Sequence, residues 1–175
     1  MKEYRRECET WAEENQGAIG IVQNKLRSYG GTKVSPQPQP NISILAKCGM
    51  LVKPLRVTLR KGRPNACYEN VIEMWNARGP RSTLVCRGLG YALSEDGMWR
   101  PHHWGFSFTK GEYKIIETTV PWLMYWGLPD GLGACDTHHL ALLMDQLFDL
   151  TSLDPTPILP AGTTQEKTPL QLCRT

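Results

Sequence analysis

One hairpin pattern in the middle of the chain constrains its fold more than any other feature. Large and small residues alternate from His103 to Thr109, which is typical of an extended strand with two different faces. Lys110-Gly111 supplies a turn, and a second strand is predicted from Tyr113 through Thr119. The large residues of the first strand are Trp104, Phe106 and Phe108. The hairpin therefore presents a broad aromatic face that other elements have to cover.

The segment from Cys67 to Gly79 predicts a helix suited to this packing. Its start is predicted to be capped by Asn65, and Gly79-Pro80 ends it. The apolar residues that share one helical face are Val71, Ile72 and Trp75. A polar, turn-rich loop from Arg60 to Asn65 leads into the helix. We therefore predict an α+β fold in which a cysteine-bearing helix packs on an antiparallel β-sheet.

Shorter patterns predict the remaining elements. A helix is expected from about Glu3 to Tyr29, although Gly17 and Gly20 weaken its middle. The further expectations are strands at Ile42–Leu45, Leu51–Leu59 and Ser82–Leu93, an irregular aromatic segment at Trp122–Pro129, and a helix at His138–Leu150 capped by Asp136-Thr137. We divide the chain into a helix with a proline-rich arm (1–41), an α+β domain (42–150) and a flexible tail (151–175).

Charge and cysteine content limit the kinds of partner. The net charge is +3 and the basic residues are scattered, so no nucleic-acid partner is expected. No stretch approaches the roughly 20 apolar residues that span a bilayer, so no membrane partner is expected either. The first residues are charged and do not form a signal peptide, and the six cysteines show no regular framework. These features predict a cytoplasmic protein with reduced thiols.

Three chemically matched residue types follow one another along these elements. Cys67 stands at a helix start, where backbone amides and the helix dipole stabilise a thiolate. His102 and His103 begin one strand of the hairpin, and Glu117 lies on the other. An imidazole beside a thiol takes and returns its proton, and a carboxylate orients the imidazole. The pattern predicts a cysteine nucleophile, a histidine base and a glutamate that positions the base.

The same residues resemble the papain-like superfamily, in the order shared by transglutaminase-like and bacterial cell-wall cysteine peptidases. They are most similar to small bacterial and phage proteins of that type, which have a Cys-x-x-Asn helix, a Gly-Tyr-Ala strand, a His-x-Trp strand and an Ile-Asp-x-Thr strand. The matching segments are Asn65–Asn70, Gly88–Ala92, His102–Trp104, Ile115–Thr119 and Tyr125–Gly127. The resemblance covers Gly62 to Pro129 and implies that 42–150 is a papain-like catalytic domain. One departure is Glu117, which stands where the pattern has Asp.

Several roles around this constellation stay open at the level of sequence. His102 is expected on the same strand face as Trp104, as in the His-x-Trp pattern. His103 is expected on the opposite face with Gly105 and Ser107, which leaves the aromatic face free to enter the core. Either histidine therefore fits as the base. The backbone amide of Cys67 is the expected oxyanion donor, with the Asn65 side chain as a second. Tyr125 and Trp126 are predicted to wall the substrate cleft.

The predicted chemistry is acyl transfer on a protein or peptide substrate without a cofactor. Protease, amidase, deamidase and transglutaminase-like activities all fit this hydrolase type. The alternative is a non-catalytic protein that captures a protein partner on the same fold. A third option is a zinc site, because Cys135 with His138 and His139 gives a Cys-x-x-His spacing to which Cys67 or Cys86 would add a ligand. No second paired ligand motif supports it, so no metal site is predicted.

Overall fold

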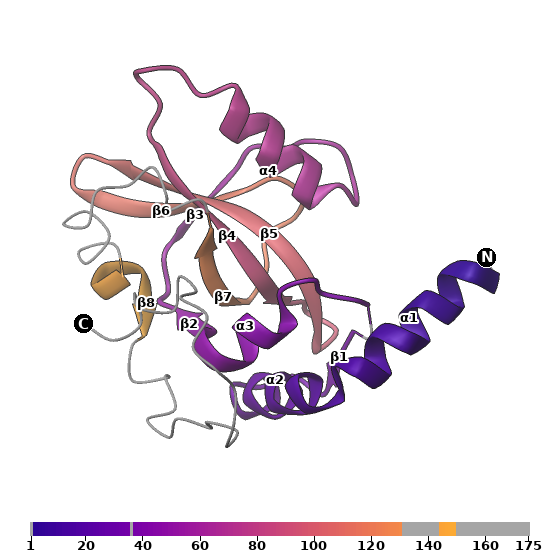
Figure 1. Ribbon diagram of the computed structural model, residues 1–175. Helices are drawn as coiled ribbons and strands as arrows, with labels where there is room; N and C mark the ends of the chain where they lie inside the picture. Colours follow the sequence, from indigo (N-terminus) through magenta and orange to yellow (C-terminus); the bar gives the residue numbers. More distant parts are fainter. Residues whose placement is uncertain (1, 36, 131–143, 150–175) are drawn as a thin grey trace, which may run out of the picture.

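The computed structural model describes residues 2–35, 37–130 and 144–149, which form an α+β structure (Figure 1). The helices are α1 (Lys2–Glu14), α2 (Gln16–Ser28), α3 (Ile42–Cys48) and α4 (Cys67–Asn76). The strands are β1 (Lys33–Val34), β2 (Met50–Val52), β3 (Arg56–Leu59), β4 (Leu84–Leu93), β5 (Met98–Thr109), β6 (Glu112–Glu117), β7 (Met124–Asp130) and β8 (Phe148–Asp149). Within the described ranges the strands form one sheet in the order β3-β6-β5-β4-β7-β2-β8, with β1 paired to β5. The sheet is mixed and not antiparallel as predicted, because β1 pairs parallel with β5 and β3 pairs parallel with β6.

The predicted hairpin is confirmed as β5 and β6. The two strands pair antiparallel from Gly105 opposite Ile116 to Thr109 opposite Glu112. Trp104 and Phe106 are fully buried on one face, together with aromatic residues of β7 and β8. Phe108, at the end of the strand, is 42% exposed and packs on the ring of Tyr113 instead. The aromatic face thus enters the core, except at its outer end.

The helices cover the opposite face of β5. At one end of the sheet, α2 and α3 bury Leu26 and Leu45 against Trp99 of β5 (Figure 1). At the other end α4 packs over Gly105, where an added Cβ would lie 2.8 Å from Met74 Cε. Glycine at this position lets the helix approach the sheet closely. Gly105 therefore fixes the height at which Cys67, the first residue of α4, sits over β5.

Three of the local predictions are wrong in their element type or extent. Ile42–Leu45 belongs to helix α3, because Ile42, Leu45 and Ala46 are buried at helical spacing. Segment Leu51–Leu59 is divided into β2 and β3 by Lys53–Leu55, whose central proline cannot continue the ladder. Most of the segment Trp122–Pro129, predicted to be irregular, belongs to strand β7 (Met124–Asp130), which pairs with β4 and β2.

The two ends of the described chain also differ from expectation. The single helix predicted at 3–29 is broken at Asn15, whose side-chain amide donates to the Trp11 carbonyl and separates α1 from α2. Residues 148 and 149 form β8 and pair with β2, so the helix predicted to reach Leu150 ends earlier. The rest of that predicted helix up to residue 143, its cap at 136–137 and the tail 151–175 lie outside the described residues. No described helix combines the length and apolar character needed to cross a membrane.

Candidate active site

Cys67 opens α4 at the end of a loop that is tied firmly to the sheet. The Asn70 side chain accepts from the Arg63 amide at 3.0 Å and donates to the Arg63 carbonyl at 2.8 Å. The amide of Gly62 donates to the Thr118 carbonyl at 2.8 Å. The predicted cap by Asn65 is wrong, because Ala66 is the N-cap residue and the cap has no side-chain hydrogen bond. The loop positions Cys67 through Asn70, and the first amides of the helix remain free of a side-chain cap.

A gap in the strand pairing of β5 receives the thiol. On the side away from β4, β5 pairs with β6 only from Gly105 onward and with β1 only at Met98 and Trp99. Between these points no described strand pairs with that edge of β5. Cys67 interacts there with the side chains of both His102 and His103 and with the backbone amide of His103. The open ladder therefore supplies the thiol with a backbone donor as well as an imidazole.

The pairing of the histidine with the acid is resolved by geometry. His102 Nε2 lies 2.9 Å from Glu117 Oε2, and His102 is only 2% exposed. This contact leaves Nδ1 as the ring nitrogen that can exchange a proton with Cys67. His103 has no hydrogen bond to Glu117 among the described contacts, and its ring packs edge-on against Tyr68 at 5.0 Å. Of the two candidate bases, His102 is the one that bridges the thiol and the carboxylate.

Glu117 is fully buried and its carboxylate has five hydrogen-bond partners. Oε1 accepts from the amides of Thr118 and Thr119 and from the Thr119 hydroxyl, each at 2.8 Å. Oε2 accepts from the Tyr125 hydroxyl at 3.1 Å and pairs with His102. A buried carboxylate with this many donors is held ionised in one orientation. Its position in turn fixes the plane of the His102 ring.

The pKa values within the site are shifted toward a charged pair. Burial raises the pKa of Cys67, but hydrogen bonds with His102 and His103 and the His102 charge outweigh it and bring the value to about 6. Burial lowers the pKa of His102, but its contacts with Cys67 and Glu117 prevail and raise the value to about 9. Burial also raises the pKa of Glu117, yet His102 and Thr119 hold that pKa below its usual range. The lowered pKa of Cys67 and the raised pKa of His102 together favour a thiolate–imidazolium pair near neutral pH.

The structure separates the two residues predicted to wall the cleft. Tyr125 is buried and its hydroxyl donates to Glu117, so it supports the carboxylate from within the core. Trp126 is fully buried on the other face of β7, in the cluster with Leu26 and Leu45. Neither side chain lines an open cleft beside Cys67, and this prediction is wrong. Asn65 is exposed two residues before Cys67, and its role as an oxyanion donor stays a prediction.

Two further residues contact the site: Trp122, which the sequence did not single out, and Thr119, the threonine of the Ile-Asp-x-Thr pattern, to which the sequence assigned no role. The Trp122 ring lies 4.9 Å from the His102 ring and covers it from one side. Thr119 contributes two of the donors to Glu117. Its position two residues after a strand-ending acid is a signal for such a turn, because a hydroxyl and an amide there can reach back to the carboxylate.

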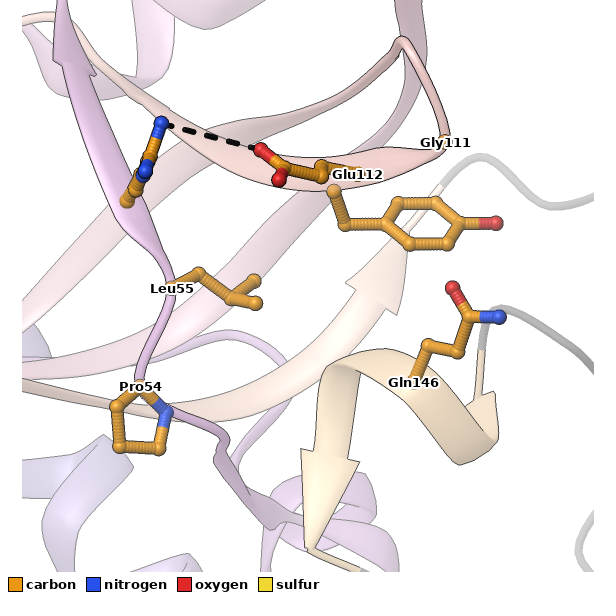
Figure 2. A pocket seen from close by; sticks show the side chains of 7 residues that line it. Pro54, Leu55, Gly111, Glu112 and Gln146 are labelled. Atoms are coloured by element: carbon orange, nitrogen blue, oxygen red, sulfur yellow. Dashed lines mark ion pairs between the residues drawn. The ribbon is translucent and has the colours of Figure 1, made fainter.

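A hollow of about 370 Å³ lies at the far end of the same strands (Figure 2). Its lining includes Pro54 and Leu55 before β3, Glu112 and Tyr113 at the start of β6, and Gln146. Glu112 forms an ion pair with Arg56 across its rim at 4.0 Å. β6 runs from Glu112 at this hollow to Glu117 at the thiol site, a span of roughly 16 Å for a strand of this length. The hollow is therefore separate from Cys67.

The described residues contain no group of three or more His, Cys, Asp or Glu side chains arranged to hold a metal ion. The candidate zinc ligands Cys135, His138 and His139 lie outside the described ranges. No protein-family model, curated protein or solved structure matches this chain. The roles of Cys67, His102 and Glu117 therefore depend on their own geometry.

Proposed function

We propose that this protein is a cysteine-dependent acyl-transfer enzyme with a papain-like catalytic domain. Cys67 is the nucleophile, His102 is the general base and acid, and Glu117 orients His102. One observation carries the proposal: His102 is buried between the Cys67 thiol, whose pKa it lowers, and a carboxylate held by four further donors. A purely structural cysteine at a helix start has no need of this arrangement. Strongly shifted pKa values of this kind are concentrated at functional sites.

The chemistry follows from the charged pair. The Cys67 thiolate attacks the carbonyl carbon of an amide or thioester, and the carbonyl oxygen becomes an oxyanion. The proposed donors to that oxygen are the Cys67 backbone amide, which as a first-turn amide has no intrahelical partner, and the Asn65 side chain. The His102 imidazolium then gives its Nδ1 proton to the leaving amine or thiol as the bond to the acyl carbon breaks. An acyl-enzyme results.

Release of the acyl group reverses the proton transfer. Neutral His102 takes a proton from water or an incoming amine as that nucleophile attacks the thioester carbonyl. The tetrahedral intermediate collapses, the bond to sulfur breaks, and the thiolate and imidazolium are restored. Water gives a hydrolase, and an amine gives a transferase. The substrate we propose is a protein or peptide, attacked at a backbone amide, an isopeptide bond or a glutamine side chain.

Alkylation by iodoacetamide tests the proposal without a known substrate. We expect Cys67 to react with a pH midpoint near 6, whereas an unactivated thiol has a pKa of about 8.5. Adducts are mapped by mass spectrometry after short pulses between pH 5 and pH 9. Cys8 on α1 and the urea-unfolded protein provide the comparison within the same chain. Equal pulse labelling of Cys67 and Cys8 at pH 6.5 would refute an activated Cys67.

A further inference from the structure

A second hollow, of about 240 Å³, lies between α4 and the loop that precedes it. We call it the loop pocket. Arg60 and Lys61 line it from the loop, Asn70 and Glu73 line it from α4, and Thr118 lines it from the chain just after β6. Thr118 directly follows Glu117, so the pocket adjoins the thiol site without containing any of its three reacting groups. Nothing in the proposed acyl-transfer step uses these side chains.

The loop that carries the two cations is held in place. The Arg60 amide donates to the Glu117 carbonyl at 2.7 Å, and the Gly62 amide donates to the Thr118 carbonyl at 2.8 Å. The Asn70 side chain bonds both backbone groups of Arg63. Gly62 lies so close to Asn70 that an added Cβ would be 2.5 Å from its Cγ. Bonds on both sides of Lys61 thus fix the backbone that presents the charges, which lowers the entropy cost of binding a ligand there.

The charge of the loop pocket is positive. The chain from Lys53 to Cys67 contains cations and no acid, and the cations are Lys53, Arg56, Arg60, Lys61 and Arg63. Glu73 is the one acidic residue of the lining and is already paired with Arg63. Among the described contacts, neither Arg60 nor Lys61 has an ion-pair partner. The two cations in the lining are therefore available to an anionic group.

A buried hydroxyl provides independent support for a ligand. Thr118 is 2% exposed, and its Oγ1 has no hydrogen-bond partner within the described part of the chain. Buried polar atoms are nearly always bonded, so an unpartnered hydroxyl on a residue of the pocket lining favours a ligand with an oxygen acceptor. A hydroxyl donates well to a carboxylate or phosphate oxygen, the same acceptors that Arg60 and Lys61 attract.

We propose that the loop pocket binds a carboxylate of the peptide substrate and so selects acidic peptides for Cys67. The inference rests on the proposed acyl-transfer function. Asn70 and Glu73 lie three and six residues after Cys67 along α4, which is roughly 5 to 9 Å along a helix axis. An extended peptide covers this distance in two to three residues. The bound carboxylate is either an acidic side chain at that spacing or the end of a peptide chain.

Protection of Cys67 from iodoacetamide tests this selection, whichever way the peptide runs. The probes are acetyl-Ala-Glu-Ala-Glu-Ala-amide and its Gln counterpart, and acetyl-pentaalanine as the free acid and as the amide. We expect an acidic member to protect Cys67 at about tenfold lower concentration than its neutral partner. The first pair reports side-chain carboxylates and the second pair reports a terminal carboxylate. Equal protection by acid and amide in both pairs overturns the inference and leaves an activated Cys67 in place.

Matched variants connect the preference to the loop pocket. Arg60→Gln with Lys61→Gln should abolish the preference while Cys67 still reacts with iodoacetamide. Arg27→Gln with Lys47→Gln removes the same charge from exposed positions on α2 and α3 and should leave the preference intact. Loss of the preference in both double variants would assign it to overall charge and refute the pocket. Anisotropy of rhodamine-labelled probes measures the same preference without the thiol, so failure of Cys67 to react does not prevent the test.

Discussion

Replacing Glu117 by glutamine changes one atom and removes the charge that holds His102 protonated. The amide oxygen can still accept from Thr118 and Thr119, but the new amino group then faces His102 Nε2 and the Tyr125 hydroxyl. A donor in that place favours the His102 tautomer that accepts at Nε2 and keeps its proton on Nδ1, beside the thiol. The imidazolium that stabilises the thiolate is lost. We expect the pH midpoint of Cys67 alkylation to rise from about 6 to above 7.

The size of the effect follows from the shift of His102. Its pKa is raised from 6.5 to about 9 by Cys67 and Glu117 together, and each pKa unit corresponds to about 1.4 kcal/mol. If Glu117 supplies half of this, the variant loses roughly 1.5 to 2 kcal/mol of imidazolium stabilisation, which corresponds to a little over one pKa unit. A Cys67 pKa raised by that amount, from about 6 to just above 7, lowers the thiolate fraction at pH 7 about two- to threefold. The rate of Cys67 alkylation at pH 7 should fall by a similar factor.

Pulse alkylation with mass-spectrometric mapping measures this rate for Cys67 alone. Glu112→Gln is the matched control, because Glu112 lies on the same strand and is exposed, and within the described part of the chain its side chain forms only a 4.0 Å ion pair with Arg56. That variant should keep the midpoint of the unmodified protein. An unchanged midpoint in Glu117→Gln, with the folded structure verified by circular dichroism, would show that Glu117 does not set the charge state of His102.

Three further outcomes are expected. Because the pKa of His102 is raised from 6.5 to about 9 in the folded protein, this group stabilises the fold fully below pH 6.5, and the stabilisation is lost as pH rises through about 9. Because the pKa of Cys67 is lowered from 9 to about 6, this group stabilises the fold fully above pH 9, and the stabilisation is lost as pH falls through about 6. The two contributions change with pH in opposite directions, so the free energy of unfolding measured in urea should be constant from pH 6.5 to pH 8.5. Cys67→Ala should instead lose stability as pH rises. A pH-dependent free energy of unfolding in the unmodified protein would exclude the ion pair. Tyr125→Phe removes one donor from buried Glu117 and should cost about 1.5 to 3 kcal/mol in urea unfolding, with a higher midpoint for Cys67; a loss below 0.5 kcal/mol would contradict the hydrogen bond. Asn70→Ala frees both backbone groups of Arg63 and should cost about 1 to 3 kcal/mol and slow Cys67 alkylation, whereas Asn24→Ala on the exposed side of α2 should do neither.

The spacing of large apolar side chains was enough to predict those helices and strands that have two different faces. The β5–β6 hairpin and the α4 helix have alternating or helical spacing of large apolar residues, so local pattern and tertiary packing agree. Ile42–Leu45 was misassigned because four residues are too few to separate a period of 2 from one of 3.6. Only the burial of Ala46 and Cys48 beyond it shows that the segment continues as a helix.

The roles of individual residues depended on the register of the strands, which could not be predicted from the sequence. Tyr125 and Trp126 are neighbours on β7, so their side chains point to opposite faces of the strand. This follows once the segment is known to be a strand. The choice between His102 and His103 depended in the same way on which strand face meets Glu117. Cys67 reaches both histidines only because β6 and β1 leave part of the β5 edge unpaired. Such a gap is a property of three segments distant in sequence and has no local signature.

The extra methylene of Glu117 is explained by the same register. β6 ends at Glu117, and the chain turns so that the amides of Thr118 and Thr119 face back toward the side chain. An aspartate here could accept from those amides, as short acidic side chains do at turns, but its second oxygen would then fall short of His102. Glutamate spans both, with Oε1 on the turn and Oε2 on the imidazole and the Tyr125 hydroxyl. Glu117→Asp should therefore keep its charge and still lose part of the Cys67 activation. The orientation of His102 by Glu117 thus depends on side-chain length as well as on charge.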